Sequence, residues 1–364
     1  MTTQPPGPVL VTGGNGYIAS WLVKRLLDRG FDVHATVRDT RDPTRTDHLR
    51  AVARGGPGSL SLFDADLLEA AGFDRAMAGC HIVFHTASPL IVRDVADPVR
   101  DLVQPATRGT RHVLEAVNRT PSVRRVVLTS SIVAIYGDAA DLQEIEADRF
   151  DESHWNSTSH AHHQPYSYSK TLAERLAWEL AAGQDRWDLV AVNPGLVLGP
   201  GLSRHTSAEG VLVMRDFGNG YYRFGAPELE FAIVDVRDVA EGHLRAGLLP
   251  RVRGRHILVS ETLSLIEIAS ILRNRFGDGY PFPRQTVSRV AALMLAPRRR
   301  IPQAVARRNI GYPLRFHNRY AREALGMTFR PAAESIVDHF RQLVDDGLVS
   351  RVRRNFEDAR PGSR

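Results

Sequence analysis

Short apolar runs alternate with helical patterns through the first two-thirds of the chain, and this alternation limits the possible folds more than any other feature. Strands that alternate with helices form parallel sheets through right-handed crossovers, with helices on both faces. We therefore expect an α/β fold with a doubly wound parallel sheet. The expected strands are 9–12, 32–37, 60–63, 82–86, 125–129 and 189–192, with helices notably over 18–29, 99–118 and 166–182.

The regularity fades after residue 200, which indicates a second structural unit. We expect residues 7–200, joined by 231–260, to form the main domain. Residues 201–230 and 261–348 are expected to form a smaller, mostly helical C-terminal lobe. The ends, 1–6 and 357–364, are expected to be disordered. Within the later part, strands are expected at 231–234 and 256–259, and helices at 207–217, 237–248, 264–276, 287–295 and 331–346.

Composition excludes several classes of protein. The 364 residues are 43% apolar and 24% charged, which is typical of a globular protein. Cys80 is the only cysteine, so no intramolecular disulfide forms. A basic start followed by an apolar run is absent, as is an apolar run of membrane-spanning length. We expect a cytoplasmic protein, a monomer or homodimer, without a membrane partner.

The basic residues are unusual in kind, because 45 of the 47 are arginines. The net charge of +6 raises the question of a nucleic-acid partner. No nucleic-acid-binding motif occurs, so we interpret most of these arginines as a solvated surface and expect no nucleic-acid partner. Where lysine does occur, at Lys24 and Lys170, its compact ammonium can matter chemically.

A glycine-rich turn follows the first expected strand and precedes the first expected helix. Its sequence is Thr12-Gly13-Gly14-Asn15-Gly16-Tyr17-Ile18-Ala19. A helix N-terminus presents unpaired amides that suit a pyrophosphate, and the glycines allow its close approach. In this context the pattern predicts a Rossmann-type dinucleotide-binding domain. The expected contacts here are Gly13, Asn15, Gly16, Tyr17 and Ile18.

The end of the second strand distinguishes between the two nicotinamide dinucleotides. Arg38 follows the strand directly, and a guanidinium there can bind the extra phosphate of NADP. Arg45 follows in the same loop region. Asp39 is the kind of residue that favours NAD, so NAD(H) stays open as the less favoured cofactor. Asp66 and Leu67, after the third strand, are placed either to touch the adenine or to cap a helix.

Tyr166 and Lys170 lie four residues apart on an expected helix, so they share one face. A phenol ordinarily titrates near pH 10, and lowering its pKa by three units requires roughly 4 kcal/mol. A neighbouring ammonium and an oxidised nicotinamide both favour the phenolate. Ser131 follows the fifth strand, at the edge of the sheet where ligands of such folds bind. These three residues predict an acid–base site for carbonyl chemistry.

The set of motifs resembles the extended short-chain dehydrogenase/reductases, and within them the branch of dihydroflavonol reductases, cinnamoyl-CoA reductases and yeast-type carbonyl (methylglyoxal) reductases. The resemblance covers most of residues 8–348. It is carried by segments 11–22, 35–39, 79–89, 129–131, 150–155, 166–178, 193–200 and 234–240.

The resemblance implies an NADPH-dependent reductase of aldehydes or ketones, reversible as an alcohol dehydrogenase. Tyr166 would protonate the carbonyl oxygen, Lys170 would bind the nicotinamide ribose, and Ser131 would hold the substrate. Further cofactor contacts are implied at Thr86, Ala87, Ser88, Thr129, Tyr166, Lys170, Pro194, Gly195 and Val197. The implied substrate contacts are Ser88, Ser131, Ile132, Tyr166, Leu196 and Tyr222, and the C-terminal lobe would help to bind the substrate.

Two departures from the branch and one histidine cluster need interpretation. His112 stands where relatives often carry asparagine, and we interpret it as a packed helix residue rather than part of a proton relay. The longer aromatic and cysteine-containing motif of cinnamoyl-CoA reductases is missing around Tyr166, which argues against a CoA thioester substrate. His154, His160, His162 and His163 are interpreted as part of a loop at the substrate mouth, with no metal.

Two other functions stay open. A nucleotide-sugar epimerase or dehydratase uses the same three residues with retained NAD, and Arg38 argues against it. A non-catalytic regulator that senses dinucleotides usually lacks the tyrosine or the lysine, and both are present here.

Overall fold

The main sheet of the computed structural model has seven parallel strands, and the structure describes residues 7–88, 97–204, 208–299 and 301–351. The strand order is β3-β2-β1-β4-β5-β6-β9. β1 pairs with β2 on one side and β4 on the other, so the strand order reverses beside β1. The strands are β1 (Val9–Thr12), β2 (Asp32–Val37), β3 (Ser59–Asp64), β4 (Ile82–His85), β5 (Arg125–Thr129), β6 (Asp188–Pro194) and β9 (Gly254–Leu258).

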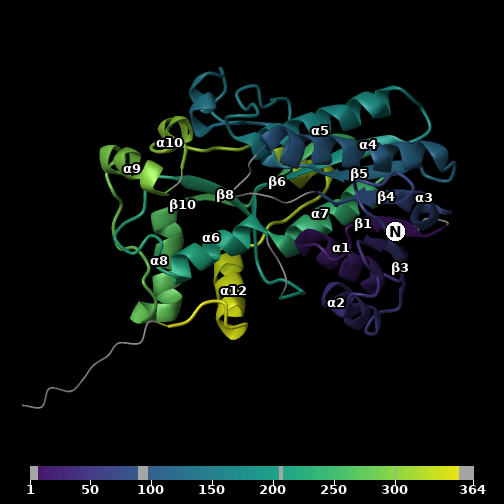
Figure 1. Ribbon diagram of the computed structural model, residues 1–364, viewed down its shortest axis with the longest axis horizontal. Helices are drawn as coiled ribbons and strands as arrows, with labels where there is room; N and C mark the ends of the chain where they lie inside the picture. Colours follow the sequence, from purple (N-terminus) through teal and green to yellow (C-terminus); the bar gives the residue numbers. More distant parts are fainter. Residues whose placement is uncertain (1–6, 89–96, 205–207, 300, 352–364) are drawn as a thin grey trace, which may run out of the picture.

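Helices cover both faces of this sheet (Figure 1). α1 (Tyr17–Asp28) and α7 (Val236–Leu248) pack together on one face, above a core of Val9, Val11 and Val190. α3 (Gly72–Met77), α4 (Gln104–Arg119) and α5 (Pro165–Ala182) cover the other face. α2 (Pro43–Ala53) follows β2, and a π-helical turn, η1 (Val99–Val103), precedes α4. The predicted doubly wound α/β fold is confirmed.

A second, three-stranded sheet lies in the C-terminal lobe, with the order β10-β8-β7. These strands are β7 (Leu196–Leu198), β8 (Glu230–Asp235) and β10 (Glu261–Ser264). α6 (Glu209–Gly218), α8 (Leu265–Phe276) and α12 (Ala332–Asp345) pack on it around Phe217, Leu272 and Phe340. Two shorter helices, α9 (Arg289–Leu295) and α10 (Gln303–Asn309), lie beside them at the left of Figure 1. A third, α11 (Arg319–Ala324), packs instead on β9 of the main sheet, with Ala321 in the main core.

Segment 231–260, which we expected to return to the main domain, is divided between the two sheets. α7 and β9 do return, and β9 pairs with β6. β8 instead pairs with β7 and β10 in the second sheet. The reason is the short β7, which leads the chain from β6 into the second sheet and offers β8 a partner. Two of the strands in this sheet, β7 and β10, have three and four residues, too few for a visible alternation.

Gly195 marks the point where the chain leaves the main sheet. Its N–H still donates to the carbonyl of Leu258 in β9, at 3.0 Å. A Cβ at this position would lie 2.2 Å from the carbonyl oxygen of Ala232, so no larger residue fits. The crossing from β6 to β7 therefore packs tightly against the backbone of β8.

The remaining expectations lie partly outside the described residues. The ends that we expected to be disordered, 1–6 and 357–364, are among the residues that the structure does not describe. Within the described ranges, no helix is long and apolar enough to cross a membrane.

Candidate active site

The glycine turn between β1 and α1 has the geometry that its sequence predicts. Gly13 has φ +64°, and a Cβ there would lie 3.0 Å from Cα of Ala87. The amides of Gly13 and Gly14 donate to the hydroxyl and the carbonyl of Thr36, at 3.0 and 2.8 Å. Gly16 precedes the helix without any side-chain cap. The first amides of α1 are thus left for an anionic ligand, which fits the predicted pyrophosphate site.

α1 is tied by its side chains to the segment that leads into the C-terminal lobe. The hydroxyl of Tyr17 donates to the carbonyl of Gly199 at 2.5 Å, and the indole of Trp21 donates to the carbonyl of Pro200 at 2.7 Å. Burial raises the pKa of Tyr17 well above 10, so this phenol stays protonated. Its side chain therefore has a tethering role, and a cofactor contact at Tyr17 would come from the backbone.

Arg38 lies exposed at the end of β2 and has no hydrogen-bond or ion-pair partner among the described residues. Its acidic neighbour Asp39 is occupied, because its carboxylate accepts from the backbone and the guanidinium of Arg41. The hydrogen bonds from Arg41 lower the pKa of Asp39. In the sequence, Arg38 favoured NADP and Asp39 favoured NAD. In the structure Asp39 is paired with Arg41, so only Arg38 is free to bind a phosphate.

Arg45 lies on α2 and pairs with Asp42 at 2.9 Å. It also lines a hollow beside the glycine turn, together with Asn15, Thr44, His48 and Ser203. The predicted contacts Asn15 and Arg45 therefore border the same space, although they are 30 positions apart in the sequence.

Asp66 and Leu67 form a turn after β3. The carboxylate of Asp66 accepts from the amide of Leu68 at 2.8 Å, which closes a turn and does not cap a helix, because α3 begins only at Gly72. His112 on α4 donates from Nδ1 to the carbonyl of Leu67 at 2.9 Å. His112 therefore supports the turn as a packed helix residue, which is the interpretation favoured from the sequence.

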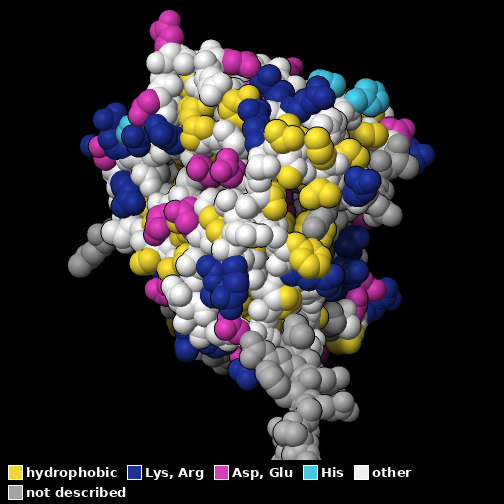
Figure 2. Space-filling model, turned by 90° about the vertical axis from the view of Figure 1, so that its left-hand side faces the viewer, with side chains coloured by type: hydrophobic (Ala, Val, Ile, Leu, Met, Phe, Trp, Pro, Cys, Tyr) yellow, Lys and Arg dark blue, Asp and Glu magenta, His cyan; other side chains and the backbone are white. Residues whose placement is uncertain are grey.

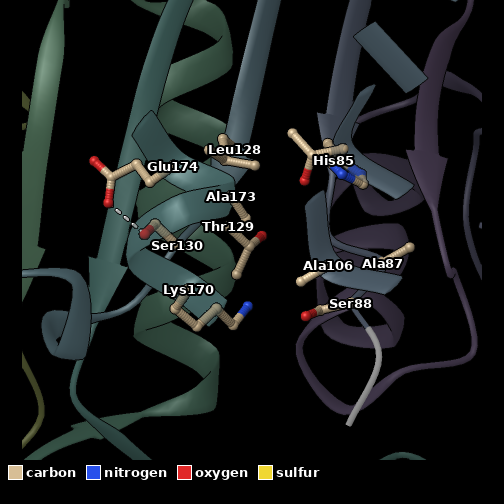
Figure 3. A pocket seen from close by; sticks show the side chains of 11 residues that line it. His85, Ala87, Ser88, Ala106, Leu128, Thr129, Ser130, Lys170, Ala173 and Glu174 are labelled. Atoms are coloured by element: carbon tan, nitrogen blue, oxygen red, sulfur yellow. Dashed lines mark hydrogen bonds between the residues drawn. The ribbon is translucent and has the colours of Figure 1, made fainter. Parts of the chain in front are cut away.

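A small pocket lies at the carboxyl ends of β4 and β5, in front of α5 (Figure 3). Lys170 projects from α5 toward Thr129, and Ser88 lies across the gap (Figure 3). The hydroxyl of Thr129 donates to Nε2 of His243, at 2.7 Å, because Nδ1 of that ring is engaged with the carbonyl of Val239. The full lining is His85, Ala87, Ser88, Ala106, Thr110, Leu128, Thr129, Ser130, Lys170, Ala173 and Glu174.

The wall opposite Lys170 is built on Thr12 at the end of β1. The amide of Ala87 donates to the hydroxyl of Thr12 at 3.1 Å, and Thr86 bonds to the carbonyl of the same residue. His85 bonds to the Thr12 hydroxyl at 2.9 Å. The predicted contacts Thr86, Ala87 and Ser88 are thus held beside the glycine turn.

Lys170 is buried and has no hydrogen-bond or ion-pair partner among the described residues. Burial lowers its pKa from 10.5 to about 8, and the nearby charge of Glu174 partly offsets this effect. Burial, assisted by the charge of Lys170, also lowers the pKa of His85 to about 3. The site therefore holds one unpaired ammonium beside a neutral imidazole at neutral pH.

Tyr166 is partly buried at the start of α5, one turn before Lys170, and its hydroxyl has no partner among the described residues. Burial, reinforced by the charge of Glu209, raises the pKa of Tyr166. The sequence argument required the opposite shift. The protein alone keeps this phenol in its acid form, and Lys170 does not counteract the cost of burial.

Ser131 caps the short helix η2 (Ile132–Ala134), and its hydroxyl accepts from the amide of Val133 at 3.3 Å. Its carbonyl accepts from the amide group of Asn193 at 3.1 Å. The hydroxyl proton of Ser131 is thus free to point toward a substrate oxygen.

A buried ion pair behind the site was missed by the sequence analysis. Nε of Arg255 on β9 donates to Glu174 on α5 at 2.6 Å, and both side chains are buried. Glu174 also accepts from Asn193 at 2.9 Å and from Ser130. Arg255 stacks over Trp155, 3.9 Å from the ring centroid, and donates to the carbonyl of Ala134 at 3.2 Å. This cluster joins the helix of Tyr166 and Lys170 to the loop of Ser131. The one indication of this cluster in the sequence is Glu174, which lies four residues after Lys170 and therefore on the same face of the helix.

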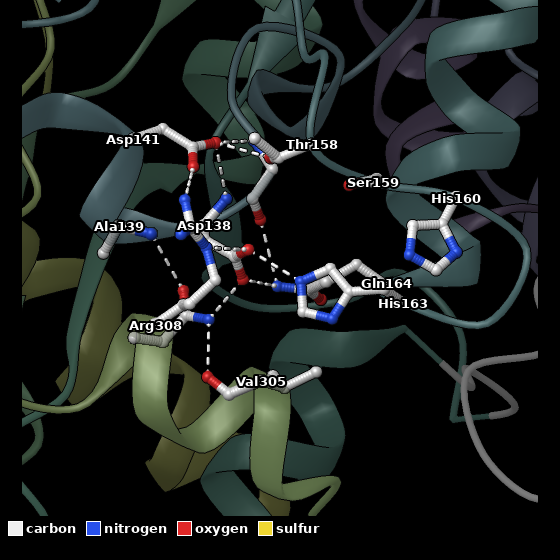
Figure 4. A network of polar contacts seen from close by, with 12 residues as sticks. Asp138, Ala139, Asp141, Thr158, Ser159, His160, His163, Gln164, Val305 and Arg308 are labelled. Atoms are coloured by element: carbon white, nitrogen blue, oxygen red, sulfur yellow. Dashed lines mark hydrogen bonds and ion pairs between the residues drawn. The ribbon is translucent and has the colours of Figure 1, made fainter. Parts of the chain in front are cut away.

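A second network holds the loop that leads into α5 (Figure 4). Asp138, fully buried, accepts from His163 at 2.7 Å, from Arg308 at 3.0 Å and from Asn309 at 2.6 Å. Gln164 also donates to Asp138, at 3.2 Å, and takes a left-handed backbone with φ 56°. Because Gln164 lies two residues before Tyr166, helix α10 of the C-terminal lobe helps to set the start of α5.

The four histidines predicted to border the substrate mouth are engaged mostly with protein groups. His154 pairs with Asp151 at 2.8 Å, and His163 with Asp138. The backbones of His160 and His163 bond to one another. Across the described residues, no group of three or more metal-binding side chains is arranged around one point.

The remaining predicted residues lie on two sides of the site. Pro194 ends β6 and Gly195 follows it, while Val197 in β7 packs partly on the main core. Leu196 and Ile132 are buried in separate hydrophobic clusters, so their side chains serve packing first. Tyr222 packs on Phe217, 5.2 Å between ring centroids, at the edge of the C-terminal core.

Comparisons with known proteins place these observations in a family. The NAD dependent epimerase/dehydratase family matches residues 9–259. A cinnamoyl-CoA reductase of Medicago truncatula is 42% identical over 273 residues, covering 74% of this chain and 80% of the relative. A dihydroflavonol 4-reductase of Gerbera hybrida is 31% identical over 285 residues, covering 77% of this chain and 75% of the relative.

The solved structures agree. The yeast methylglyoxal/isovaleraldehyde reductase, crystallised with NADPH, superposes with a TM-score of 0.76 at 27% identity, over 94% of this chain and all of the other. The predicted resemblance and fold class are both confirmed. The chain belongs to the NAD dependent epimerase/dehydratase family, within the extended short-chain dehydrogenase/reductases.

Proposed function

We propose that this protein is an NADPH-dependent reductase that converts aldehydes or ketones to alcohols, reversibly. The observation that carries the proposal is the pair on α5: the hydroxyl of Tyr166 and the ammonium of Lys170 share one helical face and both lack partners among the described residues. Relatives named as cinnamoyl-CoA and dihydroflavonol reductases support this reaction class, and the yeast methylglyoxal/isovaleraldehyde reductase, crystallised with NADPH, supports the cofactor.

The residues present fit a dinucleotide. The uncapped start of α1 would hold the pyrophosphate, and Gly13 leaves room for its approach. Arg38 would bind the phosphate on the adenosine ribose, which favours NADPH over NADH because Asp39 is already paired with Arg41. Lys170 would bind the nicotinamide ribose. When bound, NADPH supplies the hydride.

The chain's own residues supply the proton. Tyr166 is held in its acid form by burial, so it is ready to donate its proton to a carbonyl oxygen as negative charge develops there. With the cofactor bound, the ammonium of Lys170, one turn away on the same helical face, would favour the resulting phenolate. Ser131 orients the same oxygen through its free hydroxyl proton. Positioned acid catalysis of this kind contributes about 10²- to 10⁴-fold in rate.

The proposal also covers the substrate class, the oligomeric state and the location of the protein. A small carbonyl compound is the proposed partner, and the enzyme is proposed to act as a monomer or homodimer. We also propose a cytoplasmic location.

The experiment follows NADPH consumption with a panel of aliphatic, aromatic and dicarbonyl compounds. Tyr166→Phe is compared with Tyr168→Phe, a matched change two residues away on the same helix. We expect Tyr166→Phe to abolish turnover with little effect on NADPH affinity, and Tyr168→Phe to retain turnover. Turnover by Tyr166→Phe within tenfold of the parent would disprove the acid assignment. Conversion of a nucleotide sugar without net cofactor oxidation would instead identify an epimerase or dehydratase.

A further inference from the structure

The charge of this chain is distributed very unevenly. Residues 279–322 contain ten arginines and not one Asp, Glu or Lys. The rest of the chain carries 37 basic and 41 acidic residues, so it is net acidic. The formal charge of +6 therefore comes from one 44-residue segment. Arg284 and Arg308 are paired within the protein, with Asp278 and Asp138, so only the arginines of this segment that lack such a partner are available to an anionic ligand.

The same segment carries large apolar side chains in contact with solvent. Val290 and Met294 on α9 are 63% and 69% exposed, and their spacing places them on one face of the helix. Leu295 is 42% exposed. Phe224, 71% exposed, joins them, because its carbonyl and the next residues bond to the strand-like segment 285–287 just before α9. We call these four residues the α9 face.

Arginines surround the α9 face. Arg298 lies one turn beyond Met294, and Arg307 lies on the neighbouring α10, both exposed. Arg223 lies over the ring of Phe224, with 4.5 Å between its guanidinium carbon and the centroid. Figure 2 shows the end of the molecule that carries α8, α9 and α10, with hydrophobic and basic side chains side by side on its upper part.

We propose that the α9 face and its arginines form a peripheral docking surface for anionic lipid membranes. Apolar side chains that enter the headgroup region and arginines that pair with lipid phosphates are the two parts of such a surface. A second copy of this chain fits poorly, because a two-fold contact here would bring the same arginines together. A nucleic acid would pair with the arginines but would not bury the apolar side chains of Val290, Met294 and Leu295. A surface of this kind needs no membrane-spanning helix, and none occurs among the described residues. The proposal does depart from our expectation, drawn from the sequence, that the protein has no membrane partner.

The test measures co-sedimentation of the full chain with phosphatidylcholine vesicles, with and without about one-third phosphatidylserine. We expect binding only to the anionic vesicles, weakened as salt rises, because each arginine near such a surface contributes about fivefold. The double change Arg298→Ala/Arg307→Ala should therefore weaken binding about 25-fold. Arg251→Ala, an exposed arginine outside the segment, is the matched control and should change binding less than twofold.

The apolar part is tested with Met294→Asp against Leu348→Asp, an exposed leucine on another element. Met294→Asp should weaken vesicle binding at least tenfold, whereas Leu348→Asp should not. NADPH consumption in solution, measured with the same proteins, should be unchanged, which shows that each variant is folded. Equal binding to neutral and anionic vesicles, or none to either, would overturn the proposal. A dimer in the parent protein that Met294→Asp dissociates, without vesicle binding, would assign the α9 face to a second copy.

Discussion

Replacing Lys170 by methionine is expected to stabilise the protein while removing its activity. Methionine keeps most of the length of the side chain and removes the charge. The ammonium is buried without a partner, and burial lowers its pKa to about 8 from 10.5. Keeping Lys170 charged therefore costs free energy in the folded state, where the ammonium is buried, but not in the unfolded chain, where it is hydrated.

The size of this cost follows from the pKa shift. The pKa of Lys170 falls by about 2.5, from 10.5 to about 8, which corresponds to about 3 kcal/mol at 1.36 kcal/mol for each pKa unit. Below pH 8 both the folded and the unfolded parent are protonated at Lys170, so the whole cost is present. Between pH 8 and 10.5 the unfolded chain binds more protons than the folded one, so the parent gains stability as the pH rises.

The measurement is the free energy of unfolding in urea, for the parent and Lys170→Met, without NADPH, from pH 7 to about pH 9.5. At pH 7 the variant should be more stable by about 2–3 kcal/mol, which allows for some lost packing. At pH 9.5 this advantage should fall to about 0–1 kcal/mol, because deprotonation of Lys170 in the folded parent has removed about 2 kcal/mol of the cost. A variant that is less stable than the parent at pH 7, or an advantage that does not change with pH, would refute the reasoning.

Three further outcomes are expected. Arg38→Ala should raise the KM for NADPH at least tenfold and leave the KM for NADH within about twofold, since a phosphate contact is lost, whereas Arg54→Ala, at an exposed arginine directly after α2, should affect both little; equal effects on the two cofactors would mean that Arg38 does not bind the phosphate. Arg255→Met should lower Tm by about 5 °C, because about 4 kcal/mol is lost when Glu174 is left buried without its partner, and calorimetry would contradict this if Tm fell by less than 1 °C. Arg308→Ala should lower kcat about tenfold with unchanged NADPH affinity, because Asp138 then holds Gln164 and the start of α5 less firmly; a change in KM for NADPH alone would place its effect elsewhere.

The main sheet could be predicted closely because its strands are recognisable in the sequence as apolar runs. Each predicted strand of the first two-thirds matches an observed one to within two residues at either end. Buried parallel strands are nearly continuous apolar runs, and the intervening helices are long enough to show their period. The expected helix over 99–118 begins instead with a π-helical turn at Val99–Val103, a distinction that apolar periodicity does not make.

The second sheet could not be predicted, because pairing between distant short strands leaves little local trace. β7 and β10 have three and four residues. The sequence of their partner, β8, is equally compatible with a strand of the main sheet and a strand of the second sheet. The site shows the same limit. Tyr166, Lys170 and Ser131 follow from helical spacing and strand ends, whereas the pairing of Arg255 with Glu174 joins residues 81 positions apart that no spacing relates. The direction of the Tyr166 pKa shift was likewise decided by burial, which one sequence does not display.

The tether between α1 and segment 199–201 has a consequence for kinetic order. Tyr17 and Trp21 bind Gly199 and Pro200, and the backbone of Gly201 is gripped on both sides by Gln342 of α12. We expect a nucleotide bound at the start of α1 to restrain the C-terminal lobe through this tether. We therefore expect sequential turnover, with the coenzyme bound first and the carbonyl compound second. Product-inhibition patterns test this order: NADP should compete with NADPH, and the alcohol should not.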